Sequence, residues 1–105
     1  MLDLPNLTQF GIGAFDGTSI TSVTGLGSIT ALPQDAFVNC TSLTSVTLPS
    51  TCTSIGNLAF ADDSNLSSID LSNVVTIGVS SFKGCTSLTG TLNLPKLTTL
   101  GELAF

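Results

Sequence analysis

The chain has 105 residues and a formal net charge of −5, and it contains no Trp, Tyr, His or Arg. Lys83 and Lys96 are its only positively charged side chains, so it cannot neutralise a run of phosphates, which argues against nucleic acid and anionic membrane surfaces as partners. The absence of His removes the commonest general base and metal ligand near neutral pH, which argues against most hydrolases and zinc enzymes. With 42% hydrophobic residues, the chain is too apolar to be a disordered coil.

Residues 1–10 are the first place to look for a targeting segment. They have no basic region and no sustained apolar stretch, so they do not form a signal peptide. No apolar run elsewhere approaches the roughly 18 residues of a membrane span, and we expect no insertion into a membrane.

Phenylalanine recurs at intervals of 22 or 23 residues, at Phe15, Phe37, Phe60, Phe82 and Phe105. The residue before each is Ala or Ser, and the residues five and eight positions earlier are always apolar. A unit this short cannot bury a hydrophobic face alone and closes a core only by stacking on copies of itself. The period therefore predicts a solenoid in which the five Phe residues form a structural spine.

The period divides residues 1–105 into about 4.5 units. These are a partial unit 1–15, followed by 16–37, 38–60, 61–82 and 83–105. Neither end carries the polar segment that caps a solenoid. We therefore expect the chain to be a segment of a longer protein, or its copies to associate end to end through the open repeats.

Each unit predicts the same series of elements. Ser45–Leu48 and Ser68–Leu71 alternate polar and apolar residues, which is typical of a short strand with one face inward. In three units a proline follows the last inward Leu. It ends the strand at a position where no backbone N–H is needed for hydrogen bonds between strands. Thr53–Ile55 predicts a second extended piece. Gly56–Phe60 is then long enough for about one helical turn that carries the Phe ring into the core.

The unit formed by Cys40–Pro49 and Thr53–Phe60 closely resembles the BspA-like class of leucine-rich repeats, and the same signature returns at Cys85–Pro95. The resemblance covers the whole chain. It implies a right-handed solenoid with a parallel β-sheet, built from short strands, turns and single helical turns. Gly25, in place of an inward Leu, and Asp63, where neighbouring units have Cys, depart from the pattern without threatening the fold.

The resemblance also implies a function and a location. Proteins of this class are found at the cell surface or are secreted, and adhesion to host or matrix proteins is their usual role. We therefore expect a non-enzymatic, cofactor-free module for protein–protein interaction or adhesion, in an extracellular or cell-surface location. The alternatives are a structural spacer segment of a larger surface protein, or a weak carbohydrate-binding module.

The polar positions between the inward strand residues form a column, namely Asp3, Thr24, Thr47, Asp70 and Asn93. In leucine-rich repeats this strand face is the usual recognition surface, because a stacked sheet presents side chains at fixed spacing without an ordering cost. We take this strand-face ladder as the candidate binding face. The alternative is that these residues are simply those that exposed strands prefer, since no Trp, Tyr or Arg is available as a hot spot.

The three cysteines do not predict a disulfide or a metal site. Cys40 and Cys85 share a column but lie two coils apart, which at roughly 4.8 Å per coil is too far for a disulfide. Cys52 belongs to an apolar column and is predicted to be a buried thiol. A metal site of Cys40, Asp63 and Cys85 would lack a fourth ligand and any histidine, so we expect none.

Asp63 allows two interpretations. Counted from the inward Ile or Leu of each unit, it shares its column with Gly17, Cys40 and Cys85. If that column faces inward, backbone N–H groups of the adjoining loops must donate to its carboxylate. The favoured alternative is that Asp62 and Asp63 lie on an exposed bend.

Nucleophilic catalysis lacks an activating group. The chain is rich in Ser and Thr hydroxyls, but it has no His and only two Lys that could activate one. We therefore expect no catalytic residues.

Overall fold

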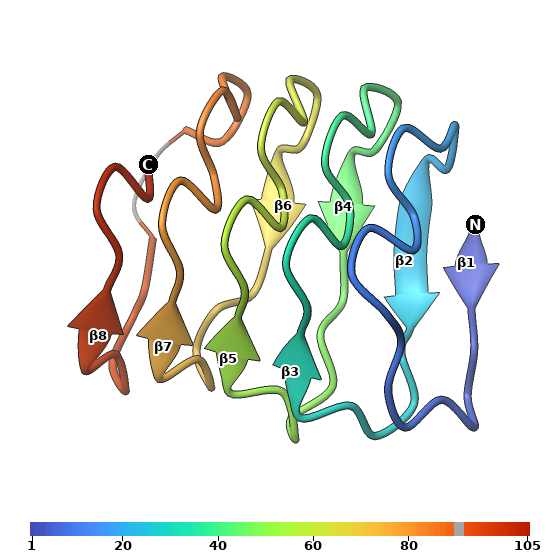
Figure 1. Cartoon of the computed structure of the whole chain (residues 1–105), viewed down its shortest axis with the longest axis horizontal. Coiled ribbons are helices and arrows are strands. Elements are labelled where there is room, and N and C mark those ends of the chain that lie inside the picture. The colour runs from blue at the N-terminus through green and yellow to red at the C-terminus, as the bar shows by residue number, and fades with distance from the viewer. Residues whose placement is uncertain (90–91) are drawn as a thin grey trace.

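The computed structural model describes residues 1–89 and 92–105, which wind into a β-solenoid of about four turns with a spacing of about 23 residues (Figure 1). Successive coils lie side by side along the molecule. Each of the three central coils contributes one strand to each of two sheets, and the first and last coils contribute one strand each among the described residues. The predicted solenoid fold with parallel strands is therefore confirmed. Gly90 and Thr91, which belong to the second copy of the repeat signature, lie outside the described residues.

The two sheets are parallel and four-stranded, with strands only two to four residues long. The first contains, in order, β1 (Leu2–Asp3), β2 (Ser22–Gly25), β4 (Ser45–Val46) and β6 (Ser68–Ile69). The second contains β3 (Ala31–Leu32), β5 (Ser54–Ile55), β7 (Thr76–Ile77) and β8 (Thr99–Leu100). Val23 pairs with Val46 and Val46 with Ile69, so identical positions of the repeat stack on one another.

A third set of hydrogen bonds, which we call the turn ladder, runs through residues 13–17, 35–39, 58–62, 80–84 and 103–105. In the central coil the N–H groups of Leu58, Phe60 and Asp62 donate to carbonyls of the following coil at 2.7–3.0 Å. The intervening N–H groups of Ala59 and Ala61 donate to carbonyls three residues earlier, at 3.3 and 3.1 Å. Every second peptide therefore bonds to the next coil.

The helical turn predicted for Gly56–Phe60 is wrong, and no described residue is helical. Leu58 has a φ of 60° and Asp62 a φ of 64°, both in the left-handed region, so the backbone alternates and cannot continue as a helix. Left-handed residues recur on both sides of the Phe, at Gly13 and Gly17, Asp35 and Asn39, Leu58 and Asp62, and Ser80 and Gly84. The cause is the bonding between coils, which requires alternate N–H groups to face the neighbour.

Adjacent coils are also in close backbone contact between the second sheet and the turn ladder. A Cβ added at Gly78 would lie 2.7 Å from the Asn57 nitrogen and 2.8 Å from the Gly56 carbonyl carbon. A Cβ at Gly56 would lie 2.6 Å from the Pro33 carbonyl carbon. These glycines are therefore needed because the coils pack closely, whereas Gly11, in the first coil, has open space around the equivalent atom.

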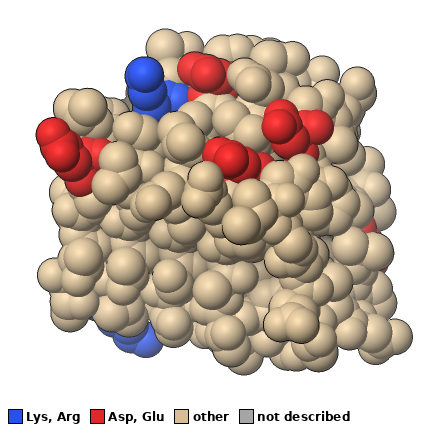
Figure 2. All heavy atoms as spheres, in the orientation of Figure 1, with Lys and Arg blue, Asp and Glu red and all other residues tan. Residues whose placement is uncertain are grey.

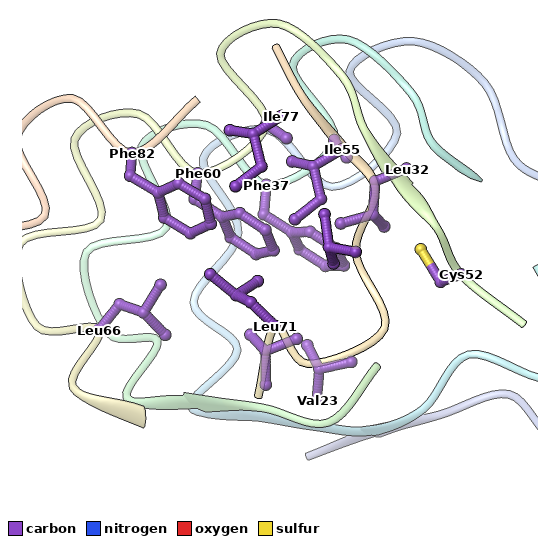
Figure 3. Close-up of a cluster of buried hydrophobic side chains, with 14 of the residues drawn as sticks. Val23, Leu32, Phe37, Cys52, Ile55, Phe60, Leu66, Leu71, Ile77 and Phe82 are labelled. Atoms are coloured by element: carbon purple, nitrogen blue, oxygen red, sulfur yellow. The ribbon is translucent and has the colours of Figure 1, made fainter. Parts of the chain in front are cut away.

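The core lies between the two sheets and the turn ladder. Phe37, Phe60 and Phe82 are fully buried in a row, with the aliphatic residues of both sheets around them (Figure 3). Consecutive rings from Phe15 to Phe105 stack with centroids 5.0–5.6 Å apart and planes within 16° of parallel. Cys52 is buried in an aliphatic column, as predicted.

Candidate functional site

The strand-face ladder lies on the outer face of the β1–β2–β4–β6 sheet. All five of its residues are exposed: Asp3, Thr24, Thr47, Asp70 and Asn93. Pairing of β2 with β4 and of β4 with β6 places Thr24 beside Thr47 and Thr47 beside Asp70. Asp3 lies in β1 and Thr24 in β2, whereas Thr47 and Asp70 directly follow β4 and β6. Asn93 is exposed and lies in no described strand.

The first rung of the ladder is irregular. Leu2 pairs with Val23, but the register then shifts so that Asp3 pairs with Gly25 rather than with Thr24. A Cβ at Gly25 would collide with the Asp3 carboxylate. Leu26 is fully buried, so the core stays filled although Gly25 supplies no inward side chain.

The missing side chain at Gly25 leaves a shallow groove of about 300 Å³ on this end of the strand face. Its polar walls come from Asp3, Thr24 and Thr47. Two prolines that follow the strands, Pro5 and Pro49, complete it together with Gly25, Leu26 and Gly27. The sequence marked Gly25 as a departure from the repeat but did not predict that prolines would border a groove.

The electrostatics of the strand face are acidic. Asp3 and Asp70 carry its only charges, because the other ladder residues are Thr or Asn. The Ser72 N–H donates to Asp70 Oδ1 at 2.9 Å and lowers the pKa of this exposed carboxyl, so Asp70 is ionised at neutral pH. In Figure 2 the acidic side chains gather in the upper half, and the lower half carries few charges. The turn ladder carries three further acids, Asp16, Asp35 and Asp62, and one cation, Lys83.

In the column of Cys40, Asp63 and Cys85, the first two side chains are buried and Cys85 is half-buried. The prediction that Asp63 lies on an exposed bend is wrong, because its side chain is 0% exposed, whereas Asp62 is exposed. The Cys40 N–H donates to Asp63 Oδ1 at 2.8 Å, which is the kind of donor that the inward alternative required. The thiols of Cys40 and Cys85 donate to backbone carbonyls, and among the described residues no group of three or more His, Cys, Asp or Glu is arranged to hold a metal ion.

Thr18, and not Gly17, begins the column that contains Cys40. Thr18 Oγ1 lies 3.5 Å from Cys40 Sγ, while Gly17 has a φ of 68° and belongs to the left-handed positions of the turn ladder. Counting three residues back from the inward Ile20 gives Gly17, so this way of aligning the units is wrong by one residue here. Counting three residues on from each Phe gives the observed column.

In the part of the chain that the structure describes, no helix is long and apolar enough to span a bilayer. On the strand face, Thr24 Oγ1 donates to the Leu2 carbonyl of the neighbouring coil at 3.4 Å.

The family comparison extends over nearly the whole chain. The model described as "BspA type Leucine rich repeat region (6 copies)" matches residues 2–105, which bears out the resemblance seen in the sequence. The searches of curated proteins and of solved structures gave no significant match. The chain belongs to the BspA-type leucine-rich repeat family.

Proposed function

We propose that this chain, as a member of the BspA-type leucine-rich repeat family, is an adhesion or interaction module that binds a protein partner through its strand face at a cell surface. The observation that supports this most is the exposed column of Asp3, Thr24, Thr47 and Asp70 on a rigid parallel sheet, next to a groove of about 300 Å³. Side chains on such a sheet are already ordered, so binding costs little conformational entropy.

The charge of the face indicates the chemistry of the partner. The chain carries a net charge of −5, and two carboxylates lie on the strand face without a cation among the ladder residues. A partner segment that presents Lys or Arg is therefore complementary to it. Because both carboxylates are exposed, we expect the association to weaken as the salt concentration rises.

The test compares variants of the strand face with a matched variant elsewhere. Thr47→Lys and Asp70→Lys each place a cation on the ladder, and Asp16→Lys makes the same change of charge as Asp70→Lys in the turn ladder. Each protein is immobilised, and its affinity for a panel of purified matrix and cell-surface proteins is measured by interferometry at two salt concentrations.

A panel protein that binds the wild type and Asp16→Lys equally, and loses about tenfold or more in affinity for both strand-face variants, would support the proposal. If the three variants and the wild type bind the same proteins with the same affinity, or if none binds any of them, the strand face is not a binding surface. A spacer role would then be the better interpretation.

A further inference from the structure

Asp63 is a fully buried acid between two coils, and only half of its carboxyl group is satisfied. Oδ1 accepts the Cys40 N–H at 2.8 Å, while Oδ2 is buried without a hydrogen-bond partner among the described residues. An ionised carboxylate in this position would lose its water and gain a single donor, which is unfavourable. The ionised form therefore does not fit the surroundings.

The two cysteines of the same column show which hydrogen bond a side chain normally makes at this position. Cys40 Sγ donates to the Phe15 carbonyl at 3.2 Å, and Cys85 Sγ donates to the Phe60 carbonyl at 3.1 Å. Each thiol follows one Phe by three residues, Phe37 or Phe82, and bonds to the carbonyl of the Phe one repeat before it. The corresponding carbonyl for Asp63 is that of Phe37, and a side chain that bonds to it must be a donor.

The Phe37 carbonyl differs from its equivalents because Asp63 has taken its usual donor. In three other coils the N–H three residues after the Phe donates to the Phe carbonyl, at 3.1–3.3 Å: Thr18 to Phe15, Asp63 to Phe60 and Cys85 to Phe82. In the coil of Phe37 the equivalent N–H, that of Cys40, donates to Asp63 instead. Among the described residues the Phe37 carbonyl therefore lacks the backbone donor that its equivalents have, and Oδ2 of the acid that binds this donor also lacks a partner.

We propose that Asp63 is a neutral carboxylic acid in the folded protein, accepting the Cys40 N–H with Oδ1 and donating its Oδ2 hydroxyl to the Phe37 carbonyl. Asp63 then bridges the Cys40 N–H and the Phe37 carbonyl. Its two hydrogen bonds replace the backbone hydrogen bond that joins the equivalent groups in the other coils. When Asp63 loses its proton, the carboxylate faces a carbonyl oxygen and the junction between the two coils loosens. The contact of Asp63 with Cys40 and Phe37 thus makes the junction between two coils sensitive to pH. This inference does not depend on the strand face.

The titratable groups around Asp63 do not favour its ionisation. Burial raises its pKa from an ordinary 3.8 to about 8, the Cys40 N–H opposes this rise, and the charge of Asp62 adds to it. Burial also raises the pKa of the Cys40 thiol, and that of the Cys85 thiol to about 12, so both are neutral at neutral pH. Among the described residues no cation lowers the pKa of Asp63.

The direction of the pH effect follows from proton linkage. Between the unfolded value of 3.8 and the folded value of about 8, the folded chain holds a proton at Asp63 that the unfolded chain has released. Stability is therefore highest at low pH in this range and falls as the pH rises. The unfolding equilibrium constant should rise by up to about tenfold per pH unit from this group alone.

The test is urea unfolding of the full chain across this pH range. Asp63→Asn keeps an acceptor and a donor but cannot ionise, and Asp63→Cys restores the residue of the neighbouring units. We expect both variants to lack the fall in stability that the wild type shows. Asp62→Asn, which removes the exposed neighbouring acid, should retain that fall. Parallel pH profiles for the wild type and both Asp63 variants would overturn the proposal.

A direct titration of the wild type provides an independent check. The ¹³C chemical shift of the Asp63 carboxyl carbon should change with a midpoint near the pKa of about 8. A midpoint close to the ordinary Asp value of about 3.9 would show that Asp63 is ionised in the folded protein at neutral pH, and would overturn the proposal.

Discussion

The strand face and the turn ladder are built from the same repeat but tolerate different residues. The outward column of the strand face holds Asp, Thr and Asn, all exposed, and four of these five residues lie in or directly after strands of one parallel sheet. The turn ladder repeats Phe and a small residue before it, follows a Gly in four of the five coils, and has a backbone that alternates into the left-handed region. The difference teaches that the fold is specified mainly by the turn ladder and the buried columns, which leaves the strand face free to vary with its partner.

The largest effect that would test this comparison is the loss of a buried ring. Phe60 is fully buried and stacks on Phe37 and Phe82, with centroids at 5.6 and 5.2 Å. Phe60→Ala should cost about 3–5 kcal/mol, a large part of the roughly 5–15 kcal/mol of a typical domain. Urea unfolding followed by far-ultraviolet circular dichroism measures this loss.

Phe105→Ala is the control for that loss. Phe105 stacks on Phe82 at 5.0 Å but is 53% exposed, so its truncation should cost clearly less than that of Phe60. Equal stability of Phe60→Ala and the wild type would show that the Phe stack is not the spine of the fold.

A single methyl group between coils should give the next largest effect. Gly78→Ala places a Cβ 2.7–2.8 Å from backbone atoms of Asn57 and Gly56, which cannot move without displacing the neighbouring coil. We expect a loss of about 1–3 kcal/mol. Gly11→Ala, where the added atom meets nothing within 4 Å, should stay within about 0.5 kcal/mol of the wild type. If both substitutions cost the same in urea unfolding, close packing of the coils is not the reason for the glycines.

The parts of the fold that repeat could be predicted from the sequence, because one alignment tests every unit. The strands at residues 45–46 and 68–69, the second extended piece ending at Ile55, and the burial of Cys52 all follow from apolar columns. The period alone requires stacking, since no unit can bury its own face.

The parts that depend on bonds between coils could not be predicted. The left-handed φ of Leu58 breaks the usual preference of a bulky residue, and only the hydrogen bonds to the next coil explain it. The groove beside Gly25 lies where the register of β1 shifts, and no sequence pattern indicates that shift. The burial of Asp63 was missed because a carboxylate normally marks the surface, and its donor belongs to another coil.

Substitution of Ser81 should have a smaller effect on the free energy of unfolding, and should raise it instead of lowering it. Its side chain is fully buried and its hydroxyl has no hydrogen-bond partner among the described residues, while the same position holds Ala in every other coil. Ser81→Ala removes an unsatisfied polar group and should stabilise the array by about 1 kcal/mol. A rise in the urea midpoint would confirm this, and a fall would mean that the hydroxyl is bonded in solution.

The smallest effect on stability belongs to the strand face and is the one that separates folding from function. Thr47 is exposed at the centre of the ladder, so Thr47→Lys should change the free energy of unfolding by no more than about 0.5 kcal/mol. The same variant is expected to lose the affinity for a partner described above, because the added cation repels the basic segment that the acidic face attracts. A loss of stability comparable to that of Gly78→Ala would show instead that the strand face is as constrained as the turn ladder, and the freedom that we assign to it would have no physical basis.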